Sequence, residues 1–215
     1  MKKSMALVVL SGFLFAACGG GEEETNNEEV TGGEEAVVEE SCTYAYDPEE
    51  TVLTWTAFKL TERVGVSGTF DEINVVSNDG AEDMYAVLTG ATFDIPVSSL
   101  NSNDEVRDPK IKNSFFGVMD STDRITGSVN SLSETAGEVS ITMNGMTKSY
   151  SGDVTVEGEE ITFSTTLNML DFNGQESIDS LGVVCEAKHT GPDGVNKLWE
   201  DVELVIRTTL VKTCE

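Results

Sequence analysis

Residues 139–169 read VSITMNGMTKSYSGDVTVEGEEITFSTTLNM, and the alternation of apolar and polar side chains in this stretch decides the fold class. Val139, Ile141 and Met143 each stand between polar residues, and the same period of two returns after turns that contain Gly and Asn. Side chains that alternate in this way lie on opposite faces of a β-strand, one face buried and the other solvated. The stretch therefore predicts consecutive antiparallel strands.

The same period recurs along most of the chain beyond residue 50. The expected strands contain residues 53–57, 64–70, 85–95, 124–132, 139–143, 150–156, 161–169 and 202–210. About eight antiparallel strands can close into a barrel whose interior is either filled by side chains or holds one small ligand. We therefore expect an all-β protein built as an antiparallel barrel of about eight strands.

Two segments break the alternation. Residues 103–116 have no period of two, which favours a short helix or an ordered loop near a barrel opening. In residues 176–189, Ile178, Leu181 and Cys185 stand at helical spacing and predict a second short helix. Both segments are suited to act as lids.

The first seventeen residues are typical of a secretion signal. Basic residues at the start precede an apolar run that ends at Ala17 and is too short to span a bilayer. Phe15-Ala16-Ala17 directly before Cys18 resembles the lipobox of bacterial lipoproteins, with Phe15 where Leu is usual. Cys18 would then carry two acyl chains, which anchor firmly where one does not. The alternative is an ordinary signal peptide with an incidental cysteine.

Residues 18–41 are expected to form an acylated cysteine followed by a disordered tether. Nine Glu and no Lys or Arg occur between Gly19 and Ser41, so the segment repels itself and has little apolar surface to bury. An acidic run soon after an acylated cysteine resembles the surface-export signals of Bacteroidetes lipoproteins, and a plain spacer explains it equally well. We expect a lipid-anchored protein of the cell envelope, at the periplasmic or the surface face of the outer membrane.

Residues 42–215 have the size of one domain. The chain has 13 basic and 39 acidic residues, a formal net charge of -26, which argues against nucleic acids and anionic membrane surfaces as partners because both would be repelled. The membrane contact that we expect is the lipid on Cys18. A homodimer is compatible with the sequence.

Three cysteines remain after Cys18, so at most one disulfide can form among them within a monomer. Cys42 precedes the first long strand and Cys214 follows the last. If those strands are antiparallel neighbours, the two residues come close, and an oxidising compartment would favour a bridge between them. Cys185 would then remain a small apolar residue.

Three cations precede a pair of aromatic residues in the stretch from Ser99 to Val118. Arg107, Lys110 and Lys112 come just before Phe115-Phe116, in an otherwise acidic chain. A basic rim next to aromatic rings suits an amphiphile whose anionic or polar head contacts the cations while its tail runs inward. Arg107 beside Asp108 has a plainer explanation as a structural ion pair, and the lysines as solvated charges.

The chain resembles the YceI-like family. The motifs that carry the resemblance are, in chain order, Tyr46-Asp47-Pro48, Leu53-Thr54-Trp55, Gly65-Val66-Ser67-Gly68-Thr69-Phe70, Ser99-Leu100, Arg107-Asp108, Phe115-Phe116-Gly117-Val118, Ile141-Thr142-Met143-Asn144-Gly145-Met146-Thr147-Lys148 and Asp171-Phe172. The resemblance covers residues 46–211. It departs from the family at Lys59 and Lys110, where His is common, so no role of those imidazoles transfers.

The resemblance implies an extracytoplasmic, lipocalin-like barrel that binds polyisoprenoids and related long-chain amphiphiles, with such a lipid as ligand and no further cofactor. Strand periodicity and the family motif together give the expected pocket residues. They are Leu53, Trp55, Ala57, Phe70, Phe93, Ile95, Ile111, Phe115, Phe116, Ile141, Phe163 and Leu204. Arg107, Lys110 and Lys112 are expected at the mouth.

The motifs argue against catalysis. The single His, His189, stands in a helix-end context, and neither a zinc-ligand spacing nor a GxSxG nucleophile motif is present. We therefore expect a carrier or sequestering protein for a hydrophobic small molecule. The alternatives are a surface interaction or stress-response scaffold with a filled barrel and a lipid-modifying barrel enzyme.

Overall fold

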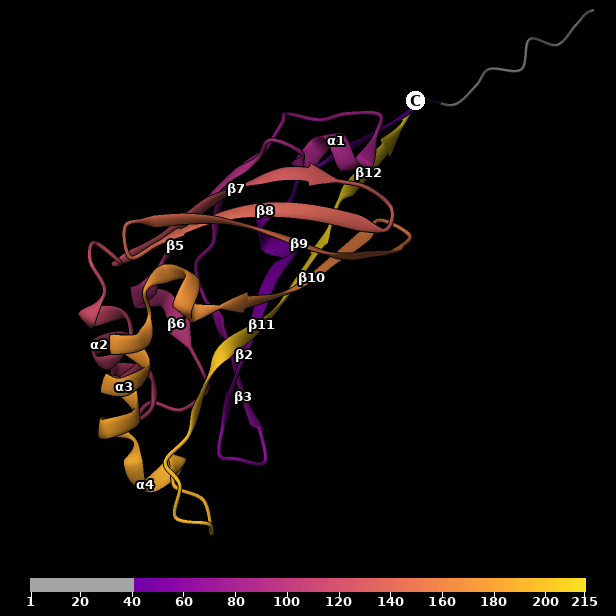
Figure 1. Ribbon diagram of the computed structural model, residues 1–215. Helices are drawn as coiled ribbons and strands as arrows, with labels where there is room; N and C mark the ends of the chain where they lie inside the picture. Colours follow the sequence, from indigo (N-terminus) through magenta and orange to yellow (C-terminus); the bar gives the residue numbers. More distant parts are fainter. Residues whose placement is uncertain (1–40) are drawn as a thin grey trace, which may run out of the picture. The chain divides into compact units, whose positions relative to one another are not determined.

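The computed structural model describes residues 41–215 (Figure 1). The predicted signal peptide, the acylation of Cys18 and all but the last residue of the acidic tether lie outside these residues. The strands are β1 (Cys42–Ala45), β2 (Thr51–Lys59), β3 (Val64–Phe70), β4 (Asn74–Val76), β5 (Thr92–Pro96), β6 (Leu100–Asn101), β7 (Arg124–Leu132), β8 (Ala136–Met143), β9 (Met146–Glu157), β10 (Glu160–Asn168), β11 (Leu198–Thr209) and β12 (Val211–Cys214). The α-helices are α1 (Met84–Leu88), α2 (Asp108–Ser114), α3 (Gln175–Val184) and α4 (Glu186–His189).

Ten strands form one antiparallel sheet in the order β4-β5-β7-β8-β9-β10-β11-β2-β3-β6. The sheet is strongly curled, as Figure 1 shows. Within residues 41–215 no pairing joins the edge strands β4 and β6, so the expected closed barrel of eight strands is wrong in both count and closure. The molecule is instead a curled half-barrel. The chain itself bridges the two edges, because β3 runs on into β4 and β5 runs on into β6 through the short 3-10 helix η2 (Val97–Ser99).

The eight strands expected from periodicity correspond to β2, β3, β5 and β7 to β11. The four others, β1, β4, β6 and β12, are only two to four residues long. A segment of that length contains no countable alternation, which is why the sequence did not indicate them.

The expectation of one strand over residues 85–95 is wrong for its first half, which is helix α1. The side chain of Asp83 accepts a hydrogen bond from the backbone N–H of Tyr85 and caps this helix. Gly90 then adopts φ of +85°, a left-handed conformation that ends the helical segment and redirects the chain into β5. Tyr85 and Val87 are two positions apart, as on one face of a strand, but two residues are too few to distinguish a strand from a helix.

Both segments that break the alternation are helical. Residues 103–116 contain α2, followed by the 3-10 helix η3 (Phe116–Val118), and residues 176–189 contain α3 and α4. The helices α2 and α3 pack against each other and against η3, and α3 also contacts β11. In Figure 1 they lie together at one end of the curled sheet. No helix within residues 41–215 combines the length and hydrophobicity of a membrane span.

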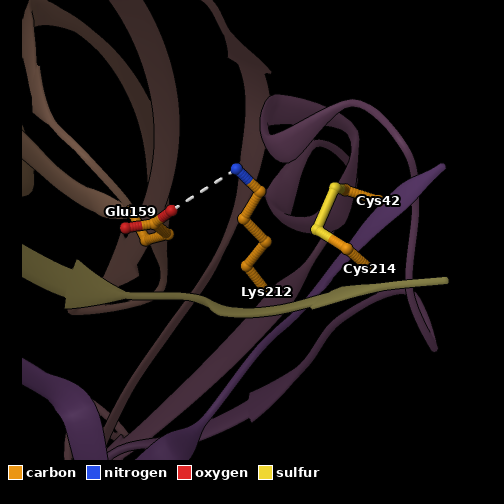
Figure 2. The surroundings of a disulfide bond; sticks show 4 residues. All are labelled: Cys42, Glu159, Lys212 and Cys214. Atoms are coloured by element: carbon orange, nitrogen blue, oxygen red, sulfur yellow. Dashed lines mark ion pairs between the residues drawn. A yellow bond between two sulfur atoms is a disulfide. The ribbon is translucent and has the colours of Figure 1, made fainter. Parts of the chain in front are cut away.

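The strands β1 and β12 form a separate two-stranded sheet that is closed by a disulfide. Cys42 pairs with Cys214 in register, and their sulfurs are bonded (Figure 2). The two cysteines are close, as expected, but they are paired directly by the short strands β1 and β12. The long antiparallel neighbours are β2, which follows β1, and β11, which precedes β12. An ion pair of 3.7 Å between Lys212 and Glu159 links this small sheet to the turn between β9 and β10 (Figure 2). Cys185 is free.

Removing the disulfide should lower the stability of the domain. It joins residues 172 positions apart, and a cross-link over so long a loop restricts the unfolded chain strongly. The double variant C42S/C214S should lose about 2–5 kcal/mol of unfolding free energy, measured by urea denaturation. C185S is the matched control and should unfold like the parent protein. Equal midpoints for the double variant and the parent would contradict the prediction.

Candidate functional site

The inner face of the curled sheet and the helices at its end enclose an apolar cavity of about 220 Å³. A cavity needs a volume of only ~10–15 Å³ to hold one water molecule, so this space is far larger than a packing defect. The walls come from almost every long strand and from α2, η3 and α3. The lining residues include Leu53, Trp55, Ala57, Phe70, Leu88, Phe93, Ile95, Ile111, Phe115, Phe116, Val139, Ile141, Met143, Leu167, Met169, Leu181, Leu198, Trp199, Val202 and Leu204.

Eleven of the twelve expected pocket residues line this cavity, and Phe163 does not. Phe163 is buried, but its ring lies against the backbone of Gly137 and Gly152, where it fills the space beside β8 and β9. The alternation in the sequence therefore predicted correctly that Phe163 is buried, but Phe163 packs in the core and does not line the cavity. Trp199, Leu198 and Leu181 also line the cavity. The sequence analysis assigned none of them to the pocket, and it noted Leu181 only for its helical spacing.

Two cavity-lining rings lean across glycines of the neighbouring strand. Trp55 pairs with Gly68, and a Cβ on Gly68 would overlap the indole and lie 2.6 Å from the carbonyl oxygen of Asn101. Phe93 pairs with Gly127 in the same way, and a Cβ there would come 2.9 Å from Cε1 of the ring. Only glycine leaves room for these rings against the sheet.

The pair Phe115-Phe116 closes the helical side of the cavity. The two rings meet edge to face, with centroids 5.1 Å apart and planes at 83°, which is a favourable aromatic geometry. Both residues are buried and line the cavity, and Ile111 lies one helical turn before Phe115 on α2. This side of the cavity is thus closed by α2, η3 and the residue between them, Phe115.

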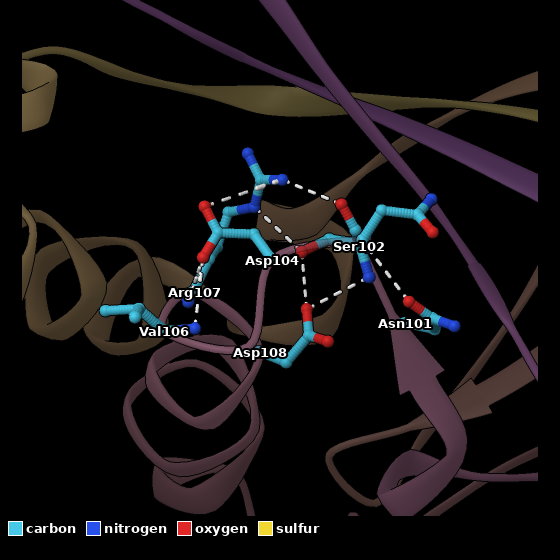
Figure 3. Close-up of polar contacts among 7 residues, drawn as sticks. Asn101, Ser102, Asp104, Val106, Arg107 and Asp108 are labelled. Atoms are coloured by element: carbon cyan, nitrogen blue, oxygen red, sulfur yellow. Dashed lines mark hydrogen bonds and ion pairs between the residues drawn. The ribbon is translucent and has the colours of Figure 1, made fainter.

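The segment before α2 is held by a polar network (Figure 3). Arg107 donates from Nε to the hydroxyl of Ser102 at 2.8 Å and from Nη2 to the Ser102 carbonyl at 2.7 Å. Asp108 does not pair with Arg107 as the sequence suggested. It accepts hydrogen bonds from the backbone N–H and the hydroxyl of Ser102. The carboxylate nearest to Arg107 is that of Asp104, at 4.0 Å. Arg107 therefore has a structural role.

The same network stabilises the ionised form of Asp104. Its carboxylate accepts hydrogen bonds from the backbone N–H groups of Arg107 and Val106, which lowers its pKa below the ordinary value. Asp104 is therefore ionised at neutral pH.

A second cavity of about 300 Å³ adjoins the first. Arg107 and Lys110 line it, whereas Lys112 lines neither cavity. Residues two positions apart on a helix do not share a face, so α2 cannot turn both lysines the same way. Lys59, Lys188 and His189 complete the basic wall of this second cavity. Within residues 41–215 no group of three or more His, Cys, Asp or Glu side chains could hold a metal ion.

The fold and the cavity define a class of protein, the curled antiparallel sheets that enclose an apolar chamber. The family model of the YceI-like domain matches residues 44–210, and the chain belongs to that family.

A solved structure supports the fold. The polyisoprenoid-binding domain from Saccharophagus degradans implicated in plant cell wall breakdown superposes with a TM-score of 0.54 at 13% identity, over 79% of this chain and 98% of that one. BcnA of Burkholderia cenocepacia aligns over 78% of this chain and 99% of its own, with 13% identity and a TM-score of 0.49.

A curated relative is similar in sequence over a shorter region. A UPF0312 protein of Staphylococcus aureus strain USA300 is 33% identical over 93 residues, which is 43% of this chain and 53% of the relative. The chain therefore spans about half the length of the curated relatives that it matches.

Adding one methyl group at Gly68 should displace Trp55 from the cavity wall. G68A forces a Cβ into the indole and the Asn101 carbonyl, so unfolding should become easier by about 1–3 kcal/mol and the tryptophan emission should shift. The matched control is G182A in α3, where the nearest atom to a new Cβ is 4.0 Å away and alanine favours the helix. G182A should be at least as stable as the parent, and equal stability of G68A would contradict the close packing.

Proposed function

We propose that this protein is a membrane-anchored, extracytoplasmic binding protein that sequesters or carries a long-chain amphiphile, such as a polyisoprenoid, a quinone or a fatty-acid-like lipid. The observation that carries this proposal is the apolar cavity, whose wall is built almost entirely from hydrocarbon side chains. A filled barrel acting only as a scaffold would have no such space. The YceI-like family and the polyisoprenoid-binding domain of Saccharophagus degradans support the same class of ligand.

The cavity wall suits a hydrocarbon chain because it offers few hydrogen-bonding groups. Its hydroxyl groups include those of Thr51 and Thr208, which bond each other at 2.7 Å and so need no partner from a ligand. The indole N–H groups of Trp55 and Trp199 donate to backbone carbonyls of Thr69 and Leu60. Each methylene transferred from water to such a wall gains roughly 0.8 kcal/mol, so binding should strengthen with chain length.

The anchor in this proposal is Cys18, which follows the signal-like segment in the sequence. The variant C18A should no longer incorporate radiolabelled palmitate and should move from the membrane fraction to the soluble fraction of the envelope. C185S, which alters the free cysteine of the described domain, should remain labelled and membrane-bound. Unchanged labelling of C18A would overturn the anchor and leave the binding function to be tested separately.

Ligand binding can be followed by the protein's own fluorescence, because both of its tryptophans, Trp55 and Trp199, line the apolar cavity. A long-chain alcohol brominated along its tail should quench both residues, saturate at one molecule per protein and be displaced by the unbrominated alcohol. Quenching that rises linearly without saturation would contradict binding in the cavity.

A bulky side chain inside the cavity should block the same titration. Ala57 lines both cavities. The variant A57F should therefore lower the affinity for the brominated alcohol at least about tenfold, because the new ring fills the space that the alkyl chain needs. T54F adds the same ring on the same strand at a position that lines neither cavity, and it should bind like the parent. Equal affinities of A57F and T54F would count against the proposed function.

A further inference from the structure

The second cavity concentrates positive charge in an acidic protein. Four of the eleven Lys and Arg residues within 41–215 line it, namely Lys59, Arg107, Lys110 and Lys188, together with the single His189. Asp104 is the one acidic residue on its wall. We call this space the basic chamber. It brings together β2, the segment before α2, α2 itself and α4.

Three of these cations are not neutralised within the part of the chain that the structure describes. Arg107 is held by Ser102 and faces Asp104, but Lys59, Lys110 and Lys188 form no ion pair among residues 41–215. Lys110 makes only a long contact of 3.4 Å to the carbonyl of Val184. Like charges gathered in one cavity repel each other, and an anion between them would relieve that repulsion.

His189 adds an unpartnered buried group to the same wall. Its side chain is only 9% exposed, and within residues 41–215 its Nδ1 is buried without a hydrogen-bond partner. Burial, and then the charges of Lys59 and Lys110, lower the pKa of His189 to about 4, so the ring is neutral at pH 7. A neutral imidazole beside lysines is ready to accept a proton once an anion changes the local potential.

The basic chamber and the apolar cavity are neighbours. Trp55, Ala57, Ile111, Leu181 and Leu198 line both of them. A single amphiphile can therefore lie across this shared wall, with its chain in one space and its head in the other.

We propose that the basic chamber binds the acidic head group, a carboxylate or a phosphate, of the amphiphile whose chain lies in the apolar cavity. This inference rests on the proposed function and selects acidic ligands from the broader class. It also replaces the rim expected from the sequence. Lys59, Lys188 and His189 join Lys110 around the head group, and Lys112 has no part in it.

Binding of the anion is coupled to uptake of a proton by His189. The titratable groups that line the chamber with His189 are Lys59 from β2, Lys110 from α2, Asp104 and Arg107 from the segment before α2, Lys188 from α4 and Cys185 at its N-cap. The charges of Lys59 and Lys110 act on the ring directly. An anion placed among them favours the charged imidazolium, so the pKa of His189 is higher in the complex than the value of about 4 in the free protein. Affinity therefore rises as the pH falls through the window between these two pKa values.

The first test compares matched acidic and neutral chains. The variant K59M/K110M/K188M should bind palmitate and farnesyl phosphate at least about tenfold more weakly than the parent and should bind hexadecanol and farnesol as the parent does. K112M removes a lysine of the same helix outside the chamber and should change none of the four affinities. Retained binding of the alcohols shows that the triple variant is folded.

Each other outcome has one meaning. Unchanged binding of the acids, or equal weakening of acids and alcohols in a triple variant whose circular dichroism spectrum and urea midpoint match the parent's, overturns the head-group proposal and leaves the proposed function standing. Failure of the parent protein to bind any of the four chains overturns the proposed function itself. Loss of palmitate binding alone, or of farnesyl phosphate alone, identifies which acidic head the chamber selects.

The second test measures the proton. Dodecane-1-sulfonate keeps its charge throughout the pH range, so titration calorimetry in buffers of different ionisation enthalpy reports protons taken up by the protein. The parent should take up a fraction of a proton on binding at pH 5–6, and H189Q should take up none while still binding the probe. Equal uptake by the parent and H189Q would overturn the coupling.

Discussion

The packing of aromatic rings against glycines of the adjacent strand is the constraint on which the rest of the structure depends. Without a Cβ at Gly68 or Gly127, the rings of Trp55 and Phe93 lean along the sheet instead of projecting toward its centre. A curled sheet of this size is ordinarily filled by its own large side chains. Here the largest side chains line the wall, and the space they leave becomes the apolar cavity.

The sequence contains most of the fold but only part of the site. Long strands were predictable because their alternation persists over many residues, as in β8 to β11. Short strands such as β4 and β6 exist only because longer neighbours offer them an edge to pair with, and α1 depends on a cap at Asp83 and a turn at Gly90. These are local details that a period of two does not reveal.

The apolar wall was predictable from inward strand positions, whereas the basic chamber was not. Lys59 lies near the end of a strand and His189 near the end of a short helix, 130 positions later, and no periodicity relates them. A signal did exist in residues 181–188, where Leu181, Cys185 and Lys188 stand at helical spacing. Leu181 lines both cavities, and Cys185 and Lys188 line the basic chamber. In the other basic segment, the same helical geometry separates Lys110 from Lys112.

The charge of the whole protein and the charge of the chamber oppose each other. A net charge of -26 repels anions at long range, but salt screens that field over about 8 Å at physiological ionic strength. The lysines of the chamber act within a few ångströms and inside a partly enclosed space. The head-group selectivity that we propose is therefore set inside the molecule, while the acidic exterior slows the approach of free anions.

The joined ends of the domain have a further consequence. Ser41 and Glu215 exchange backbone hydrogen bonds, and both lie at the end of the domain remote from α4 (Figure 1). A fluorophore attached at Glu215, or at Ser41 where the described domain begins, is consequently held far from α4. Such attachments would leave the basic chamber exposed, and circular permutation of the described domain could join Ser41 to Glu215 without disturbing it.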